Sequence, residues 1–144
     1  MQQRLIDNTL SSSSSKFALT NLTKAKEPLI FDFHLAKKIK DYVLGKQFDL
    51  SVVLLEKNKI HYLNKKYRKK DKPTNVLAFK LSKNFGEIFL CPSQIKKETY
   101  VFGRKPKALI TDMFIHALCH LKGMRHGSKM ESVEKKIRQK FGLV

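Results

Sequence analysis

Apolar residues recur at the three-to-four-residue spacing of an amphipathic helix in five stretches of the chain. In the first of these stretches, Leu35, Ile39, Tyr42 and Val43 share one face, and Gly45 can end the helix. In the last, Ser128 and Glu131 have the spacing of a capping box, which marks a helix start. The pattern predicts helices over residues 33–46, 58–68, 92–101, 106–123 and 128–141.

Three shorter stretches have the pattern of strands. Residues 49–56 are a dense run of β-branched and Leu side chains, which is typical of a buried strand. Residues 76–81 and 86–91 are two further strands, and the short link between them indicates an antiparallel hairpin. The order of elements predicts an α+β fold, in which helices pack on a small mixed sheet of about four strands.

The N-terminal part has weaker patterning. Residues 1–27 include the serine run Ser11 to Ser15, and we expect this segment to be loosely ordered, with a short strand possible near Leu5. Residues 28–144 form the predicted single domain, since the length of the chain is sufficient for one core.

Composition narrows the class of protein. Thirty Lys and Arg against twelve Asp and Glu give a formal charge of +18, which favours polyanions and above all nucleic acid, unless the host simply has a biased composition. No apolar run reaches the roughly 20 residues of a membrane helix, and the first residues lack the apolar core of a secretory signal. Cys91 and Cys119 make no disulfide framework. We therefore expect a cytoplasmic protein without a membrane partner.

The stretch HALCHLKGMRH, residues 116–126, contains three histidines. His116 and His120 lie one helical turn apart, and the chain can turn after Gly123 so that His126 approaches them. Three imidazoles on a tetrahedral ion leave one position open, and this is the pattern of a catalytic metal site.

Two neighbours of the histidines restrict the chemistry of this site. Ala117 stands where the HExxH metalloproteases have their glutamate base, so a peptidase of that kind is disfavoured. Cys119 is predicted to pack in the core in preference to binding the metal.

Two separated motifs resemble those of one known family. HALCHLKGMRH is similar to the HGxLHLxGxDH signature of the YbeY family of rRNA maturation factors, and YRKKDKPTNVLAF (67–79) resembles its YRxxDKPTDVLSF block. GEIFLC (86–91) is similar to the GDIxI strand of the family, and the three blocks occur in the family's order between residues 50 and 140.

The resemblance implies a zinc-dependent, single-strand-specific endoribonuclease that matures the 3′ end of 16S rRNA and acts in ribosome quality control. One Zn²⁺ per chain would be bound by His116, His120 and His126. Arg68 matches the arginine of the family that points into the metal cleft. The implied partners are single-stranded rRNA and the small ribosomal subunit, while any ribosomal-protein or GTPase partner is left open.

The chain departs from the family pattern most clearly at Arg125, where the family has Asp. An aspartate could orient a ligand imidazole, whereas an arginine repels a cation, although it could instead contact phosphate. Milder departures are Ala117 for Gly, Ala78 for Ser, Lys80 for Pro and Glu87 for Asp.

Within this hypothesis Arg68 and His116 are the candidate catalytic residues. The candidate RNA-binding residues are Arg68, Lys69, Lys70, Lys72 and Arg125. Tyr67 lies at helical spacing with the apolar face and is predicted to be in the core, the alternative being that it stacks on a base. The nucleophile is water or the 2′-OH of the RNA. Two other functions remain open: a non-catalytic rRNA-binding assembly factor with a structural metal, and a metallohydrolase acting on another substrate.

Overall fold

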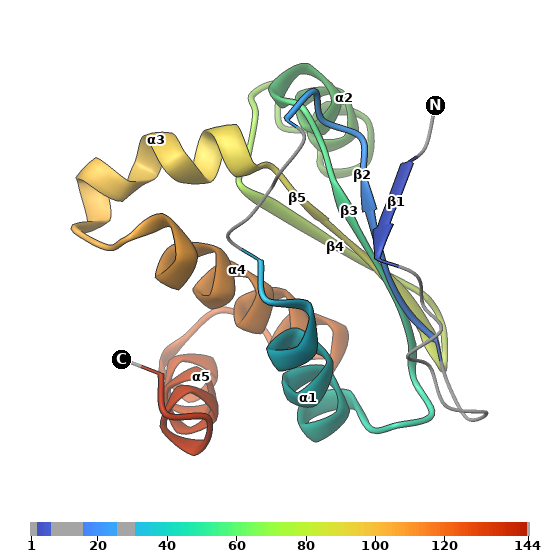
Figure 1. Cartoon of the computed structure of the whole chain (residues 1–144), viewed down its shortest axis with the longest axis vertical. Coiled ribbons are helices and arrows are strands. Elements are labelled where there is room, and N and C mark those ends of the chain that lie inside the picture. The colour runs from blue at the N-terminus through green and yellow to red at the C-terminus, as the bar shows by residue number, and fades with distance from the viewer. Residues whose placement is uncertain (1–2, 7–15, 26–30, 144) are drawn as a thin grey trace.

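A computed structural model describes residues 3–6, 16–25 and 31–143 as a five-stranded sheet with five helices (Figure 1). The predicted α+β class is confirmed. The elements in chain order are β1 (Gln3–Ile6), β2 (Phe17–Asn21), α1 (Phe33–Leu44), β3 (Asp49–Leu54), α2 (Lys57–Arg68), β4 (Val76–Ser82), β5 (Phe85–Leu90), α3 (Pro92–Phe102), α4 (Pro106–Leu121) and α5 (Ser128–Lys140).

The strands are arranged in the order β1-β2-β3-β5-β4, so β4 lies at one edge of the sheet. The three inner strands run parallel, and each edge strand is antiparallel to its neighbour, which makes the sheet mixed. Alternate side chains point to opposite faces of a strand. In β3, Leu50, Val52 and Leu54 therefore enter the main core, whereas Val53 joins a smaller cluster on the other face.

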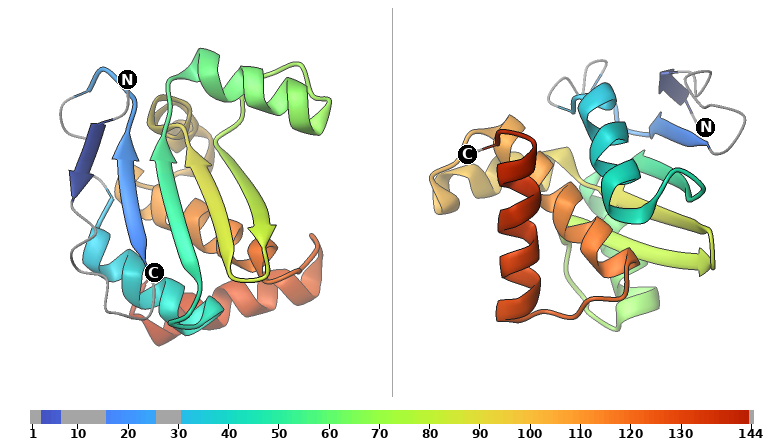
Figure 2. Two further views of the ribbon diagram at one scale, coloured as in Figure 1. Left: turned by 90° about the vertical axis from the view of Figure 1, so that its right-hand side faces the viewer. Right: turned by 90° about the horizontal axis from the view of Figure 1, so that it is seen from below.

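Helix α4 forms the centre of the helical layer. It contacts α1, α3 and α5 as well as β4 and β5 (Figure 2). Because it has neighbours on several sides, its buried residues are spread around the helix, and Ile110, Ile115 and Cys119 are all fully buried. On the other face of the sheet, Ile60 of α2 packs with Val53 and Leu77.

The N-terminal segment differs from the expectation. β1 confirms the short strand near Leu5, but residues 17–21, which were expected to be loosely ordered, form β2, in which Phe17 and Leu19 are buried. A five-residue strand that follows a serine run has too little sequence to reveal its pairing with β3, which lies some thirty residues later. Ser11 to Ser15 lie outside the described residues.

Two smaller observations complete the fold. The predicted capping box at Ser128 is not formed, because Gly127 occupies the N-cap position with φ of 148° and α5 has no side-chain cap. Across the part of the chain that the structure describes, none of the helices combines the length and the apolar character needed to cross a bilayer.

Candidate metal centre and the cleft in front of it

The three histidines converge at the C-terminal end of α4. His116 and His120 lie one turn apart on this helix, and their Nε2 atoms are 3.2 Å apart. Gly123 takes a φ of +101°, which L side chains rarely adopt, and the chain turns there so that His126 comes back to the pair. One ligand nitrogen from each ring lies within 4.8 Å of the other two. The predicted convergence is confirmed.

Two further groups orient the rings. Glu134 of α5 accepts a hydrogen bond from Nδ1 of His116 at 2.6 Å, and the carbonyl oxygen of Met124 accepts one from Nδ1 of His120 at 3.1 Å. With the proton held on Nδ1, each Nε2 keeps its lone pair directed toward the other histidines. Burial lowers the pKa of His120, and the nearby His116 lowers it further, so the ring is neutral near pH 7.

The donor set fits a small, borderline-soft divalent ion. Zinc–nitrogen bonds of about 2.0–2.1 Å at tetrahedral angles place two imidazole nitrogens about 3.3 Å apart, close to the separation of the His116 and His120 Nε2 atoms. Three neutral imidazoles with a carboxylate behind one of them are typical of zinc sites. Three histidine ligands would leave room for a further ligand from the cleft.

Sequence reasoning missed Glu134. Its side chain is largely buried beside His116, although it lies eighteen positions later in the chain. The available signal was its position four residues after Met130, which places it next to the inward face of the last helix. Glu134 supplies the carboxylate that Arg125 does not, so a partner for a ligand imidazole comes from α5.

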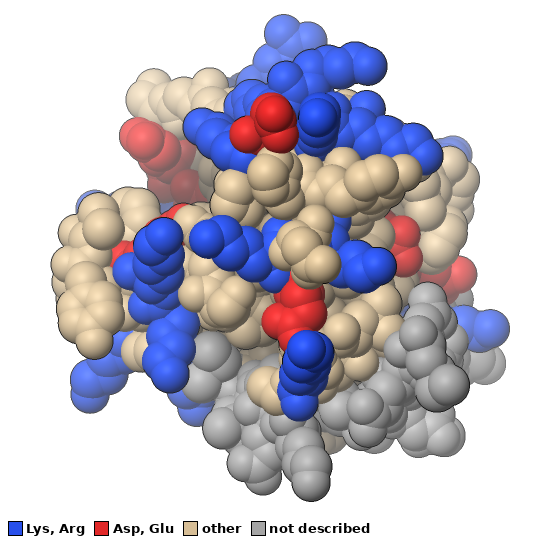
Figure 3. Space-filling view, turned by 90° about the horizontal axis from the view of Figure 1, so that it is seen from above, with Lys and Arg blue, Asp and Glu red and all other residues tan. Residues whose placement is uncertain are grey.

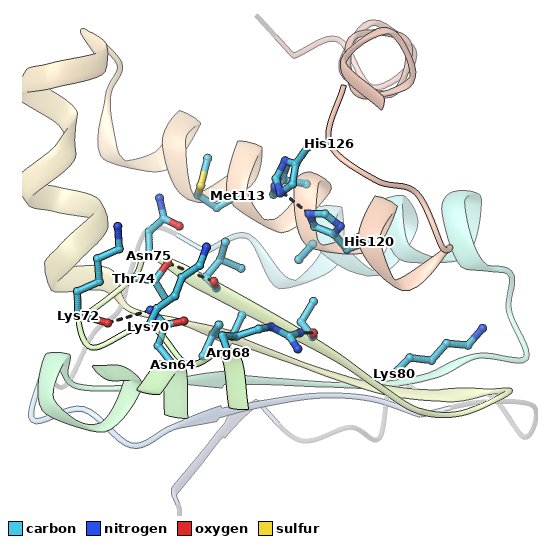
Figure 4. Close-up of a pocket in the computed structure, with 15 residues that line it drawn as sticks. Asn64, Arg68, Lys70, Lys72, Thr74, Asn75, Lys80, Met113, His120 and His126 are labelled. Carbon is cyan, nitrogen blue, oxygen red and sulfur yellow. Dashed lines mark hydrogen bonds between the residues drawn. The ribbon is translucent and has the colours of Figure 1, made fainter. Parts of the chain in front are cut away.

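A cleft of about 770 Å³ opens in front of the histidines (Figure 4). One wall is α4, with Met113, His116, Ala117 and His120, together with His126 from the turn that follows the helix. The other wall comes from α2, the loop that follows it and the edge strand β4. The lining residues on this second wall are Asn64, Arg68, Lys70, Lys72, Thr74, Asn75, Val76, Leu77, Ala78 and Lys80. A cationic wall therefore lies opposite the candidate metal centre across the cleft.

Arg68 is held in a defined position on that wall. Its Nη2 donates a hydrogen bond to the carbonyl oxygen of Ala78 at 2.7 Å, and its guanidinium carbon lies 4.6 Å from the centre of the Phe79 ring. The side chain thus crosses the edge of β4 from α2 toward the cleft. Because a guanidinium has five N–H donors, this one bond leaves others to bind a phosphate.

The basic loop after α2 is also anchored. Lys69 ends the helix in the left-handed conformation with φ of 60°, and buried Asn64 donates a hydrogen bond from its Nδ2 to the Lys72 carbonyl oxygen at 2.8 Å. Further along, Nδ2 of Asn75 donates to Glu98 of α3 at 2.8 Å. These bonds fix the path of Lys70 and Lys72 along the cleft wall.

Some predicted site residues lie elsewhere. Lys69 and Arg125 are exposed but do not line this cleft. Cys119 is buried on α4 and does not belong to the histidine group, in agreement with the packing prediction, and burial raises the pKa of its thiol to about 11. The prediction that Tyr67 is a core residue is wrong: it is 53% exposed, because α2 instead buries Ile60 and Asn64.

Comparison with known proteins agrees with this architecture. The family model described as Endoribonuclease YbeY matches residues 12–142. The Endoribonuclease YbeY of Mycoplasmopsis synoviae is 30% identical over 81% of this chain and 84% of that protein. The one from Neorickettsia sennetsu is 33% identical over 78% and 87%.

A solved structure shares the fold. The solution structure of a protein from Thermotoga maritima matches with a TM-score of 0.58 at 22% identity, over 85% of this chain and 88% of that one. The sequence matches show family membership in addition to a shared fold, because the family model matches nearly the whole chain. The chain belongs to the YbeY family of endoribonucleases.

Proposed function

We propose that this protein is a zinc-dependent endoribonuclease that cuts single-stranded RNA, and that it acts on the 3′ end of 16S rRNA and in ribosome quality control. One observation carries the proposal: the three convergent histidines form one wall of a cleft whose other wall presents Arg68, Lys70 and Lys72. A metal and a cationic wall facing each other across one cleft suit a phosphodiester substrate.

His116, His120 and His126 would hold the ion, with Glu134 fixing the orientation of His116. When bound, zinc supplies Lewis acidity toward a phosphate oxygen and lowers the pKa of water. His116 would therefore contribute to catalysis by binding the ion. His120 is partly buried, and its lowered pKa keeps the ring neutral and its nitrogen available as a ligand at neutral pH.

Arg68 would bind the phosphate at the cleavage position. Its hydrogen bond to Ala78 directs the guanidinium along the cleft, so the group needs little reorganisation when negative charge develops on the phosphate. Lys70 and Lys72 would neutralise neighbouring phosphates of the strand. Lys69 and Arg125, outside the cleft, are proposed to contact RNA beyond it.

The nucleophile is either water or the adjacent 2′-OH, and the products distinguish the two. Attack by the 2′-OH leaves a 2′,3′-cyclic phosphate, whereas attack by water leaves a linear phosphate. Analysis of the ends of a cleaved oligonucleotide therefore identifies the nucleophile. The implied partners are single-stranded rRNA and the small ribosomal subunit, and cytoplasmic localisation follows from them.

The test combines metal analysis with cleavage of an unstructured RNA oligonucleotide from the 16S 3′ region. Wild type should contain about one zinc per chain, and chelation should abolish cleavage. His120→Ala should lose both metal and activity, while His34→Ala, an exposed histidine far from the site in sequence, should keep both. Arg68→Ala should keep the metal but lose about 10²–10³-fold in kcat.

Other outcomes reject the proposal. Protein that contains no stoichiometric metal, or that cleaves equally well after chelation, is not a metal-dependent nuclease. If His116→Ala and His120→Ala instead lower the melting temperature and the RNA affinity together, and no metal-dependent cleavage exists in wild type, the protein is an rRNA-binding assembly factor with a structural metal.

A further inference from the structure

The outward face of α2 carries two exposed aromatic side chains. Tyr62 is 60% exposed and Tyr67 is 53% exposed, although each ring carries a large apolar area. Lys66 lies between them, with its Nζ 5.7 Å from the centre of the Tyr62 ring and 5.3 Å from that of Tyr67. These three residues, named here the α2 platform, have no role in the metal centre.

The surroundings of the α2 platform are strongly cationic. Residues 57–72 contain eight Lys or Arg and one acidic residue, Asp71. The carboxylate of Asp71 is already engaged by His61 at 2.7 Å and Lys65 at 3.9 Å, so little negative charge is left to oppose an anion. Viewed from above, where α2 is uppermost, Lys and Arg side chains gather densely with few acidic ones among them (Figure 3).

A line of contacts joins the α2 platform to the cleft. The ring of Tyr67 meets that of Phe79 edge-on at 5.6 Å, and Arg68 covers Phe79 at 4.6 Å. Arg68 in turn lines the cleft that faces the histidines. Arg68 of the cleft and Tyr67 of the α2 platform thus contact the same Phe79 ring, so a strand bound at Arg68 can continue toward the platform. The twelve residues of α2 span about 18 Å, enough for several nucleotides.

We propose that the α2 platform binds the unpaired RNA strand outside the cleft, with bases stacked on Tyr62 and Tyr67 and phosphates paired with Lys66 and its neighbours. The inference rests on the proposed RNA-cleaving function, since it extends the path of the same substrate. Stacking on aromatic rings is tolerant of sequence, because every base has a π-face. The platform thus selects for unpaired strands and adds affinity without fixing a base sequence.

The chain offers a matched control for Tyr67. Tyr42 of α1 is 54% exposed, meets Phe141 edge-on at 5.7 Å and has Lys140 Nζ 5.2 Å from its ring centre. Tyr42 therefore shares with Tyr67 its exposure, its edge-on contact with a phenylalanine ring and its lysine neighbour. The difference is location, since Tyr42 packs against α5 and lies outside the line of contacts to the cleft. Tyr42→Leu measures what losing such a tyrosine does by itself.

The first experiment measures RNA affinity in the presence of a chelator, so that no cleavage takes place. Oligoadenylates of about 4 and about 16 nucleotides are titrated against wild type, the Tyr62→Leu/Tyr67→Leu double variant and Tyr42→Leu. The double variant should lose about tenfold or more in affinity for the long oligonucleotide and little for the short one. Tyr42→Leu should match wild type for both. Melting temperatures confirm that all three proteins are folded.

A second measurement reports stacking directly. The chain contains no tryptophan, so Tyr62→Trp introduces a single fluorescent indole at the platform. The long oligoadenylate should quench its emission, whereas the same RNA should leave that of Tyr42→Trp unchanged.

Equal affinities of the double variant and wild type for the long RNA, or an equal loss in Tyr42→Leu, overturn the proposal and leave the platform as a surface for a protein partner. The failures of the two proposals can be told apart. Wild type that binds the long RNA through the platform but does not cleave RNA rejects the nuclease, whereas wild type that cleaves RNA while the double variant keeps full affinity rejects only the platform.

Discussion

At the scale of single residues, the site depends on which ring nitrogen of His116 and of His120 is hydrogen-bonded to the rest of the protein. Glu134 and the carbonyl group of Met124 each bond an Nδ1 atom, and this leaves the Nε2 atoms to face one another. The aspartate that the family has in place of Arg125 could orient an imidazole from the turn. In this chain, a carboxylate on α5 does so for His116.

Removing the Glu134 carboxylate should therefore weaken the metal site. We expect Glu134→Ala to lower zinc affinity by about 10–100-fold, because the His116 ring loses the partner that fixes its tautomer and orientation. Competition with a chromophoric chelator measures the change. Glu131→Ala removes an exposed carboxylate from the same helix and should leave the affinity as it is. Equal affinities for both variants would mean that Glu134 does not support the metal.

Cys119 offers a second test at this scale. Burial raises the pKa of its thiol to about 11, so we expect a neutral thiol at physiological pH that neither binds metal nor reacts readily. Iodoacetamide should alkylate Cys119 in the native protein only as fast as the protein unfolds, and rapidly in denaturant. Cys119→Ala should leave zinc stoichiometry unchanged. Loss of zinc in this variant would make the thiol a ligand after all.

At the scale of elements, the loop between α2 and β4 is the part of the cleft wall without regular structure. Its path depends on Asn64, which is buried in α2 and bonded to the carbonyl oxygen of Lys72. The left-handed conformation of Lys69 turns the chain off the helix so that this bond can form. The loop therefore belongs to the rigid frame of the site.

Asn64→Ala should release this loop. We expect it to cost about 1–3 kcal/mol of folding stability, because the carbonyl oxygen of Lys72 loses its donor in a partly buried position. Cleavage should show a raised KM, since Lys70 and Lys72 no longer hold their places. Asn58→Ala on the exposed face of α2 is the control for stability and KM. A normal KM together with reduced stability would limit Asn64 to a structural role.

The sequence predicted the elements that have a full period of their own. The helices from residue 33 onward and strands β3, β4 and β5 were predicted to within about two residues at most ends, because each has an apolar face that is legible locally. β2 and Glu134 were missed for one shared reason: each acquires its role only from a partner distant in the chain, β3 for one and His116 for the other. Tyr67 was misassigned because helical spacing does not show how far along α2 the sheet beneath it continues to cover its side chains.

At the scale of the whole molecule, one of the many positively charged side chains lies inside the fold. Lys40 of α1 is fully buried, and burial lowers its pKa. Asp41 lies beside it, 3.0 Å from Nζ of Lys40 and 3.0 Å from that of Lys37. Burial alone would raise the pKa of Asp41, but these two ammonium groups hold it below its usual value of 3.8.

This pair makes stability depend on pH with a definite sign. A carboxyl group whose pKa is lower in the folded state stabilises the fold above its unfolded pKa, and this contribution disappears as the pH falls through the lower folded value. Asp41→Asn should therefore cost about 1.5–3 kcal/mol at pH 7 and progressively less below about pH 4. Chemical denaturation across this pH range measures the difference. A pH-independent cost would show that the charge of Asp41 is not what stabilises α1.

The bond between His116 and Glu134 has one more consequence. It joins α4, in the centre of the helical layer, to the last helix, α5, through Nδ1 of the imidazole, and this leaves Nε2 as the ligand atom. An ion on the histidines and the docking of α5 therefore favour each other, and by thermodynamic linkage each strengthens the other equally. Amide hydrogens of α5 should exchange more slowly when zinc is added than when it is absent. Binding and release of the metal would thus reversibly strengthen and weaken the attachment of the last helix.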